Sequence, residues 1–269
     1  MTLTLPGSSL RSRRFVPRFL AGLAALAASG VLAAAALATV PPTLARLSWH
    51  GQSCFVLESP EGTRIVMDPI PKGLGYELPQ GLRAEAVTIS HEHFDHNNVG
   101  LVAGKPKVLR GLTADKKGWI RIDEKVKDIT VRSVGVYHDE SKGAERGLNT
   151  VFLFELAGGL RVAHLGDLGH LLTDSQLAAI GNVDVALVPV GGTFTIDAKV
   201  ATQVIEQLRP RLVVVPMHYK TDVLSKDLPL APVDEFLKGK KIRREKGNTL
   251  ALSGLKSGPS AEVVVLGYK

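Results

Sequence analysis

The chain contains one stretch that decides its fold and its chemistry, Ser90-His91-Glu92-His93-Phe94-Asp95-His96-Asn97-Asn98. Three histidines and one aspartate lie within six residues, directly after an apolar run that predicts a buried strand. Imidazole nitrogens and carboxylate oxygens are common ligands of divalent metals. His91 and His93 occupy alternate positions and can point the same way, while the loop that follows can turn Asp95 and His96 to a second point. One strand end could therefore serve two adjacent metals.

The spacing His91-x-His93-x-Asp95-His96 resembles the signature of the metallo-β-lactamase superfamily. This resemblance implies an α/β fold, a four-layer αββα sandwich with a two-metal site at one edge of the sheets. The branch of metal-dependent hydrolases that includes ascorbate-6-phosphate lactonase is the closer match, and the similarity runs from about residue 46 to the C-terminus. Its motifs resemble, in chain order, Trp49-His50-Gly51-Gln52-Ser53, Asp68-Pro69, Val136-Tyr137-His138, His164-Leu165-Gly166-Asp167, Pro189-Val190-Gly191-Gly192 and Pro216-Met217-His218-Tyr219.

The same resemblance implies a set of metal ligands. The first metal would be bound by His91, His93 and His138. The second would be bound by Asp95, His96 and His218, and Asp167 resembles the carboxylate that bridges both. Each of the last candidates along the chain follows an apolar run, where a loop at the sheet edge would form. Ligation by His and Asp alone admits two ions of zinc, manganese or iron, and zinc is the default.

Such a centre implies a metal-dependent hydrolase. Two metals can share a bridging hydroxide at neutral pH and polarise a carbonyl or phosphoryl oxygen, so no Ser or Cys nucleophile is needed. We expect cleavage of an ester, lactone or phosphoester bond in a small-molecule substrate, anionic ones included. Asp95 could also orient the hydroxide or manage a proton. His170 is either a general acid for the leaving group or a loop histidine near a helix start.

Other polar residues accompany the ligand motifs. His50 and His164 are either hydrogen-bonded residues at strand ends or groups that orient the ligands. Asp68 resembles a carboxylate that buttresses the ligand loop without binding metal. Tyr219 and Lys220 either contact an anionic substrate or belong to a solvated loop.

Two rival functions share this ligand pattern. Phospholipase D enzymes of the superfamily have a similar opening motif and His cluster, so a phosphodiesterase or phospholipase D-like hydrolase is the enzymatic alternative. A metal-bound sensor or binding module without turnover is the other, although a purely structural zinc site needs only four ligands. β-Lactam hydrolysis is disfavoured, because many zinc β-lactamases use Cys in the second site. The single Cys54 lies far from the ligand motifs in sequence and is most simply a buried apolar residue.

Short apolar runs alternate with turns from residue 46 onward, and we predict one domain over residues 39–269. Helices are expected at Thr173–Ile180, Ala198–Leu208 and Val233–Leu237, with Thr195 or Asp197 capping the second. Two sheets packed together and covered by helices satisfy this order. The expected strands are Arg46–His50, Phe55–Glu58, Arg64–Asp68, Ala86–Ser90, Ile129–Val136, Val151–Leu156, Leu160–His164, Val183–Val190, Leu212–Pro216, Thr249–Leu252 and Ala261–Leu266.

Residues 1–38 predict an export signal peptide. A basic start with four arginines runs into an Ala/Leu-rich stretch that ends near Ala38, with small residues at the positions that signal peptidase reads. Ser12-Arg13-Arg14-Phe15-Val16 resembles a twin-arginine motif, so we expect export to the periplasm or the medium by that route or by general secretion. The apolar stretch is long enough to span a bilayer, and an uncleaved N-terminal anchor is the alternative.

The composition excludes several other classes. A chain of 269 residues with 45% hydrophobic residues can fill a sizeable core, and its lone Cys cannot form a disulfide scaffold. Of the formal charge of +7, four units come from the arginines of the leader. The only dense basic run, Lys238–Lys246, lacks the interleaved aromatics that stack bases, and we expect a solvated turn there. No nucleic-acid partner is therefore expected, and membrane contact only through an uncleaved leader.

Overall fold

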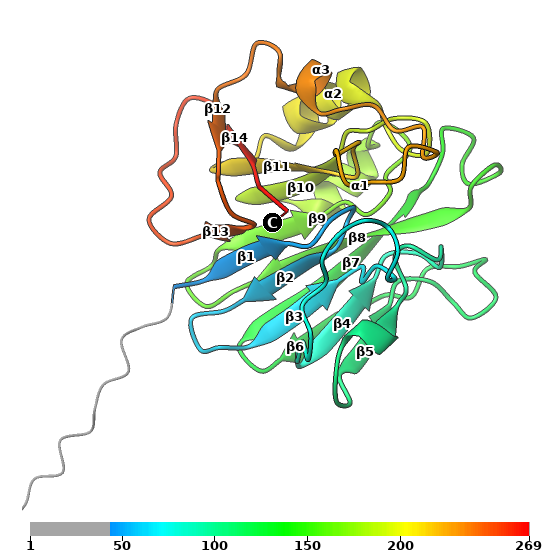
Figure 1. The fold of residues 1–269 in the computed structure, drawn as a ribbon, viewed down its shortest axis with the longest axis vertical. Helices are drawn as coiled ribbons and strands as arrows, with labels where there is room; N and C mark the ends of the chain where they lie inside the picture. The colour runs from blue at the N-terminus through cyan, green and yellow to red at the C-terminus, as the bar shows by residue number, and fades with distance from the viewer. Residues whose placement is uncertain (1–43, 269) are drawn as a thin grey trace, which may run out of the picture. The chain divides into compact units, whose positions relative to one another are not determined.

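The structure is a computed structural model, and it describes residues 44–268. Two β-sheets pack against each other in this part of the chain, which confirms the predicted sandwich (Figure 1). The predicted signal peptide, residues 1–38, lies outside the described residues and stays a prediction. Within the described residues, no helix combines the length and apolar character needed to cross a membrane.

The first sheet is built mostly from the N-terminal part of the chain. Antiparallel pairing joins β13, β1, β2 and β3, while β3, β4 and β5 run parallel. Its spatial order is β13 (Thr249–Ala251), β1 (Arg46–Trp49), β2 (Phe55–Glu58), β3 (Arg64–Met67), β4 (Ala86–Ile89) and β5 (Lys107–Arg110).

The second sheet has a parallel half and an antiparallel half. β9, β10, β11, β14 and β12 run parallel, whereas β6, β7, β8 and β9 form an antiparallel meander. The order across the sheet is β12 (Ile242–Arg244), β14 (Glu262–Val265), β11 (Val213–Met217), β10 (Val185–Pro189), β9 (Arg161–His164), β8 (Leu148–Glu155), β7 (Ile129–Tyr137) and β6 (Asp123–Val126).

The helices lie close to the predicted ranges. α1 (Asp174–Ile180) begins after Thr173, which forms a capping box with Gln176, and α2 (Ala198–Leu208) begins after Asp197, whose carboxylate accepts from Val200 N. With α3 (Asp234–Leu237), these helices cover the outer side of the second sheet (Figure 1). A short 3-10 helix, η1 (Val99–Leu101), follows the histidine-rich loop.

Alternation along the strands of the first sheet builds two apolar layers. Ile65 and Met67 of β3 belong to the core between the sheets, whereas Val66 belongs to a second cluster together with Ile70 and Tyr76. The outer face of the first sheet is therefore covered by the segment after β3 and by η1, with no α-helix in the described part of that layer. Cys54 is fully buried in this second cluster, and its burial raises the pKa of the thiol to about 12, as fits a small apolar residue.

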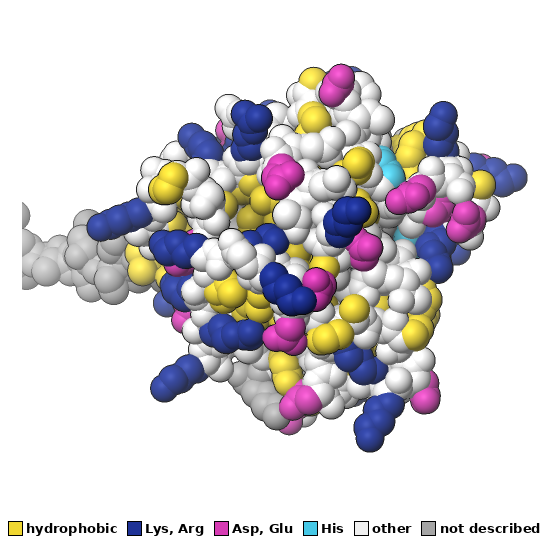
Figure 2. Space-filling model, turned by 90° about the horizontal axis from the view of Figure 1, so that it is seen from above, with side chains coloured by type: hydrophobic (Ala, Val, Ile, Leu, Met, Phe, Trp, Pro, Cys, Tyr) yellow, Lys and Arg dark blue, Asp and Glu magenta, His cyan; other side chains and the backbone are white. Residues whose placement is uncertain are grey.

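Three strands were not predicted, and one of them corrects an expectation. The basic run at 238–246 is not simply a solvated turn, because Ile242–Arg244 forms edge strand β12 beside β14. Its charges are partly neutralised, since Arg243 pairs with both Glu245 and Glu262. On the face shown in Figure 2, basic side chains are likewise interspersed with acidic ones.

Candidate metal centre

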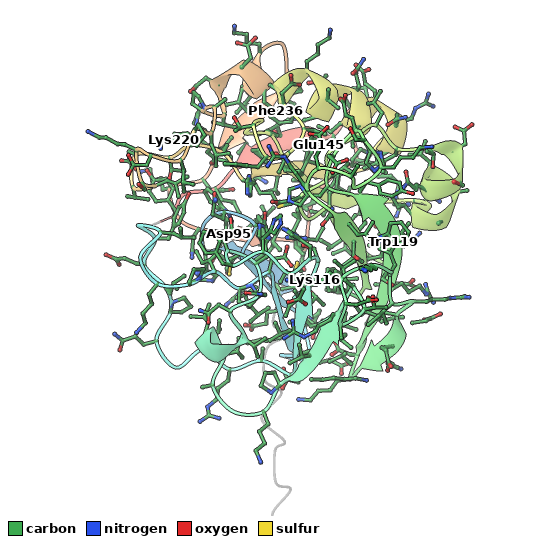
Figure 3. All side chains as sticks on the ribbon, turned by 90° about the vertical axis from the view of Figure 1, so that its right-hand side faces the viewer. Asp95, Lys116, Trp119, Glu145, Lys220 and Phe236 are labelled. Atoms are coloured by element: carbon green, nitrogen blue, oxygen red, sulfur yellow. The ribbon has the colours of Figure 1, made fainter. Side chains whose placement is uncertain are left out.

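All seven predicted ligands lie at one edge of the two sheets, on loops that follow strands. The histidine-rich loop follows β4, His138 follows β7, Asp167 follows β9 and His218 follows β11. Figure 3 shows Asp95 at this edge, where loops of both sheets meet. Because β9, β10 and β11 are parallel, their carboxyl ends lie at the same edge of the second sheet, where ligands commonly bind in open α/β sheets.

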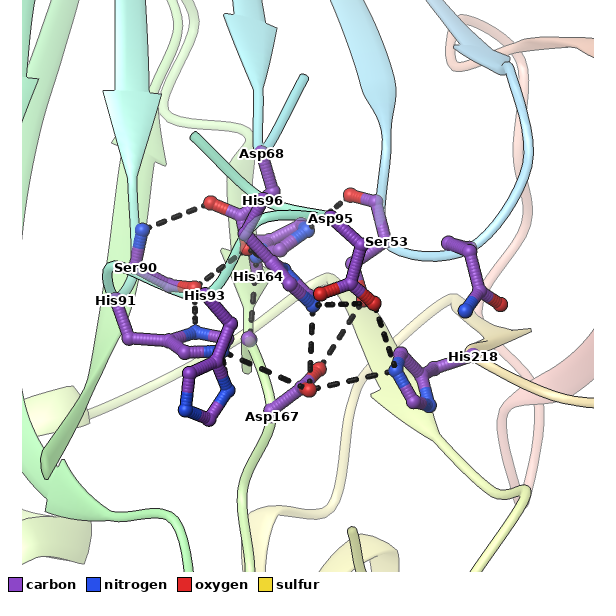
Figure 4. Close-up of polar contacts among 12 residues, drawn as sticks. Ser53, Asp68, Ser90, His91, His93, Asp95, His96, His164, Asp167 and His218 are labelled. Atoms are coloured by element: carbon purple, nitrogen blue, oxygen red, sulfur yellow. Dashed lines mark hydrogen bonds and ion pairs between the residues drawn. The ribbon is translucent and has the colours of Figure 1, made fainter. Parts of the chain in front are cut away.

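Asp167 occupies the middle of the cluster (Figure 4). Its Oδ2 atom lies 3.2 Å from the Nε2 atom of His96, 3.3 Å from those of His138 and His218, and 3.8 Å from that of His91. Ligand atoms that share one tetrahedral zinc at normal bond lengths lie about 3.3–3.5 Å apart. The spacing around Asp167 thus suits a carboxylate in contact with metals on both sides.

The other ligand atoms divide into two adjacent groups, each within 4.8 Å. One group is His91, His93 and His138, and the other is Asp95, His96 and His218. A third possible group combines Asp68 with His91 and His96. The first two groups coincide with the two sets that the resemblance implied, and Asp167 contacts members of both. The residues thus brought together are those predicted, while their assignment to two ions stays a prediction.

Several buried atoms of these residues have no hydrogen-bond partner within the described part of the chain. They include Nε2 of His96 and both ring nitrogens of His138, although these side chains are no more than 1% exposed. The two Nε2 atoms lie 3.2 and 3.3 Å from Asp167 Oδ2 but without the alignment of a hydrogen bond. A buried polar atom without a partner is destabilising by about 1–3 kcal/mol, and such atoms usually have a ligand, water or ion. The donor set of imidazoles and carboxylates fits a divalent cation of the zinc, manganese or iron type.

The protonation states of three candidate ligands favour metal binding. Burial raises the pKa of Asp167, but the neighbouring His218 and His96 outweigh it and hold the pKa well below its usual value. Burial lowers the pKa of His218, and burial with the charge of His96 lowers that of His91 further. Metals bind ionised carboxylates and neutral imidazoles, which is the state that these shifts favour at Asp167, His91 and His218. At His96, burial lowers the pKa, but the carboxylates of Asp167 and Asp95 outweigh it and raise the pKa well above its usual value, so a metal would displace a proton there.

Asp68 holds the histidine-rich loop in place, as predicted. It is fully buried, and its carboxylate accepts hydrogen bonds from Ser90 N at 2.8 Å and from His96 Nδ1 at 2.9 Å. Ser90 Oγ also donates to Asp68 and lies 3.0 Å from Nδ1 of His91. A carboxylate on the far nitrogen of a ligand histidine fixes its tautomer and its orientation. The contacts of Ser90 with Asp68 and His91 were not predicted, although a polar residue at the end of an apolar strand could have indicated them.

Asn149 holds the loop of Asp167 and was not predicted. From within β8, its amide accepts from Asp167 N at 3.2 Å and donates to Leu165 O at 2.9 Å. Gly166 lies against it with a φ of +53°, and a Cβ at that position would lie 2.4 Å from Asn149 Oδ1. Only glycine therefore fits this turn without strain.

Of the two histidines predicted beside the ligand motifs, His164 has a structural role. His164 donates from Nε2 to Ser53 O at 2.8 Å and accepts at Nδ1 from Gly166 N at 3.2 Å, which ties two loops of the site together. His50 is half-buried, and burial lowers its pKa to about 4.

His170, considered as a general acid, has both ring nitrogens in contact with the main chain. Its Nε2 accepts from Tyr137 N at 3.0 Å, and its Nδ1 lies 2.6 Å from Leu171 O, to which it donates. These contacts fit the alternative of a loop histidine near a helix start, and the general-acid role stays a prediction.

Tyr219 and Lys220 do not face a substrate site. Tyr219 is 4% exposed and stacks on Trp49. Lys220 Nζ donates to Leu228 O at 3.0 Å and also to Ser225 O. Tyr219 is therefore a core residue, whereas the half-buried Lys220 belongs to a partly solvated loop.

A cavity of about 360 Å³, hereafter the ligand cavity, opens onto this cluster. Its walls include the candidate ligands His93, Asp95, His138, Asp167 and His218. The rest of its lining contains Gln52, Glu92, Phe94, Arg146, Phe194 and Leu228. A predominantly apolar pocket with a few convergent polar groups is the usual form of a small-molecule site.

Comparison with known proteins points to one group. The family model described as "Beta-lactamase superfamily domain" matches residues 46–218. A UPF0173 protein of Pyrococcus furiosus is 32% identical over 190 residues, which cover 65% of this chain and 84% of the relative. A UPF0173 metal-dependent hydrolase of Anaeromyxobacter dehalogenans is 33% identical over 241 residues, covering 76% and 86% of the two chains. A solved structure from Thermotoga maritima, assigned to the zinc-dependent hydrolases of the metallo-β-lactamase superfamily, is 37% identical with a TM-score of 0.65, and the match covers 83% of this chain and all of that one.

Proposed function

We propose, since this chain belongs to the metallo-β-lactamase superfamily and is a metal-dependent hydrolase, that its centre binds two divalent ions and cleaves an ester, lactone or phosphoester bond. The observation that supports this most is the position of Asp167, whose Oδ2 atom lies 3.2–3.8 Å from Nε2 of four histidines. A carboxylate placed between two groups of imidazoles fits a ligand that two cations share. Zinc is the proposed metal, and the closer likeness to ascorbate-6-phosphate lactonase stays a prediction.

Bound divalent ions would lower the pKa of water and polarise the scissile carbonyl or phosphoryl oxygen. Asp95 contributes a carboxylate to the wall of the ligand cavity, where its side chain is 17% exposed. Its Oδ2 atom lies 3.6 Å from His96 Nε2 and 4.0 Å from His218 Nε2. From this position Asp95 can accept a proton from a group in the cavity and return it to the leaving group.

Gln52 gives the ligand cavity a second polar contact. The residue is 1% exposed, and its Oε1 atom has no hydrogen-bond partner among the described residues. Its backbone has a φ of +48°, and its carbonyl accepts from Trp49 Nε1 at 2.8 Å and from His218 N at 3.2 Å. The main chain of His218, a candidate ligand, therefore helps to hold the strained backbone of Gln52. We assign the side-chain amide of Gln52 to binding a polar group of the substrate.

The test combines metal analysis with a substrate panel. Metal-loaded protein is assayed on aryl esters, lactones and phosphodiesters, and its metal content is measured by mass spectrometry. We expect about two ions per chain, and His91→Ala and Asp167→Asn should each lower kcat/KM about 10³-fold or more. Asp123→Asn, on an exposed edge strand, is the matched control and should leave turnover unchanged.

Each outcome of this panel separates the candidates. Turnover of phosphodiesters alone would favour the phospholipase D-like alternative. Two bound ions with no turnover of any class would favour a sensor or binding module. Full activity of both ligand variants would overturn the proposal.

A further inference from the structure

One cationic side chain faces the ligand cavity. Among the described residues that line it, Arg146 is the only lysine or arginine. Glu92, which also lines the cavity, is already paired with Arg110 at 2.5 Å. No carboxylate lies within ion-pair distance of the Arg146 guanidinium in the described part of the chain. The positive charge of Arg146 is therefore available to an incoming group.

The Asp139 carboxylate fixes the main chain of the loop that carries Arg146. The carboxylate of Asp139, 6% exposed, accepts from Gly143 N at 2.8 Å, from Glu145 N at 3.1 Å and from Arg146 N at 2.7 Å. These bonds close a compact loop directly after His138. Because they use main-chain donors, they survive a change of the Arg146 side chain.

The guanidinium itself is positioned but not saturated. One terminal nitrogen donates to Thr193 O at 2.9 Å, and the group lies 5.1 Å from the centre of the Phe194 ring. A guanidinium has five N–H donors in a fixed fork, which matches the paired oxygens of a carboxylate or phosphate. Most of these donors remain for a substrate.

Three apolar side chains line the ligand cavity together with Arg146. Phe94, within the histidine-rich loop, is 66% exposed and lines the ligand cavity with Phe194 and Leu228. A large exposed aromatic side chain that ligates nothing is suited to contact with a substrate body. The cavity therefore combines an apolar surface with one fixed cation.

We propose that Arg146 is the specificity-determining residue of the ligand cavity, and that it binds a carboxylate or phosphate group on a substrate whose apolar body lies against Phe94 and Phe194. This inference rests on the proposed hydrolase function. The metal centre would then act on a bond near one end of the substrate, and Arg146 would recognise the anionic group at the other.

The test uses two esters that differ only at one end. Mono-4-nitrophenyl glutarate carries a terminal carboxylate, and 4-nitrophenyl valerate carries a methyl group in its place. We expect Arg146→Gln to lower kcat/KM for the glutarate ester about 10- to 100-fold and to change that for the valerate ester less than about twofold. Arg146→Lys should recover part of the loss, because it keeps the charge but not the fork. Arg121→Gln, at an exposed position outside the cavity, is the control.

A binding measurement separates failure of this inference from failure of the proposed function. Free glutarate and inorganic phosphate are titrated calorimetrically into the metal-loaded wild-type and Arg146→Gln proteins, and the tighter ligand identifies the preferred anion. If neither ester is cleaved but Arg146→Gln weakens binding of either anion about tenfold or more, the result supports the anion site and contradicts the proposed ester hydrolysis. Equal losses on both esters, or anion binding that does not depend on Arg146, would overturn the inference.

Discussion

Two cavities lie at opposite ends of β11, and the larger of them is not the one beside the candidate metal ligands. The ligand cavity, of about 360 Å³, lies beyond the carboxyl end of β11, where His218 follows the strand. A larger cavity of about 680 Å³, here called the basic groove, is lined by Arg209, Arg211, Lys238, Lys240 and Lys241 and reaches Val214 near the other end. Of these two cavities, volume alone would favour the basic groove.

The difference between the two lies in how their polar groups are satisfied. In the basic groove, Arg211 pairs with the buried Asp184 at 2.5 Å, and Lys241 pairs with Glu262 at 3.3 Å. In the ligand cavity, Oε1 of Gln52 and both ring nitrogens of His138 lack hydrogen-bond partners within the described residues. Unsatisfied buried groups are destabilising unless a ligand completes them, so they indicate a site better than cavity size does.

Metal removal should have the largest effect on this contrast. Chelation should abolish turnover and lower the melting temperature, because an ion bound only by the folded state adds about 4 kcal/mol at a concentration a thousand times its Kd. Calorimetric melts with and without chelator, followed by reloading with zinc, measure it. A melting temperature that chelation leaves unchanged would contradict a metal centre in the ligand cavity.

The basic groove has no histidine in its described lining, so we expect the acid sensitivity of stability to come from histidines elsewhere, such as His50. Burial lowers the pKa of His50 to about 4, so the unfolded state binds more protons between about pH 6.5 and 4. Stability from neutral His50 is thus fully present above pH 6.5 and is lost as the pH falls towards 4, by about 3 kcal/mol. Urea unfolding of metal-free wild type and His50→Gln measures this loss. Parallel pH profiles for the two proteins would rule out His50 as the source.

A matched pair of buried carboxylates sharpens the contrast further. Asp68→Asn leaves one acceptor oxygen in place of two, so that Ser90 N and His96 Nδ1 no longer each have one, and it should weaken metal binding about 10- to 100-fold. Asp184→Asn, beside the basic groove, should leave metal affinity unchanged and lower the free energy of unfolding by about 1–2 kcal/mol. Competition with a zinc indicator and urea titration distinguish the two effects. Equal loss of metal affinity in both variants would mean that Asp68 acts only through general stability.

The smallest effect is expected within the basic groove. Lys240 Nζ donates to Thr202 Oγ1 at 2.9 Å and lies 4.5 Å from the ring centre of Phe236. Lys240 lines the basic groove and not the ligand cavity. Lys240→Gln should change kcat/KM less than about twofold and stability by no more than about 0.5 kcal/mol. Steady-state kinetics beside Arg146→Gln provide the comparison. A large loss of turnover in Lys240→Gln would bring the basic groove into the function.

Most elements were predictable because their signals are local. Phe55–Glu58 and Ala198–Leu208 have the predicted bounds, since an apolar run and an amphipathic period with an Asp cap are visible within short windows. The unpredicted strands, β5, β6 and β12, are charged edge strands. Of these, β12 pairs with β14, which is not its neighbour in the chain, whereas β5 and β6 pair with the adjacent strands β4 and β7. The exposed face of an edge strand gives no apolar run to detect.

The sequence by itself determined which side chains could bind metal, because ligand chemistry and spacing are local properties of the histidine-rich stretch. Only the tertiary structure decided which atoms meet. It places Asp167 among histidines from three other loops, takes up both nitrogens of His170 with the main chain, and brings Arg146 to the ligand cavity. Such contacts join segments far apart in the chain, so they depend on sheet register and on which hydrogen-bond partners burial leaves within reach.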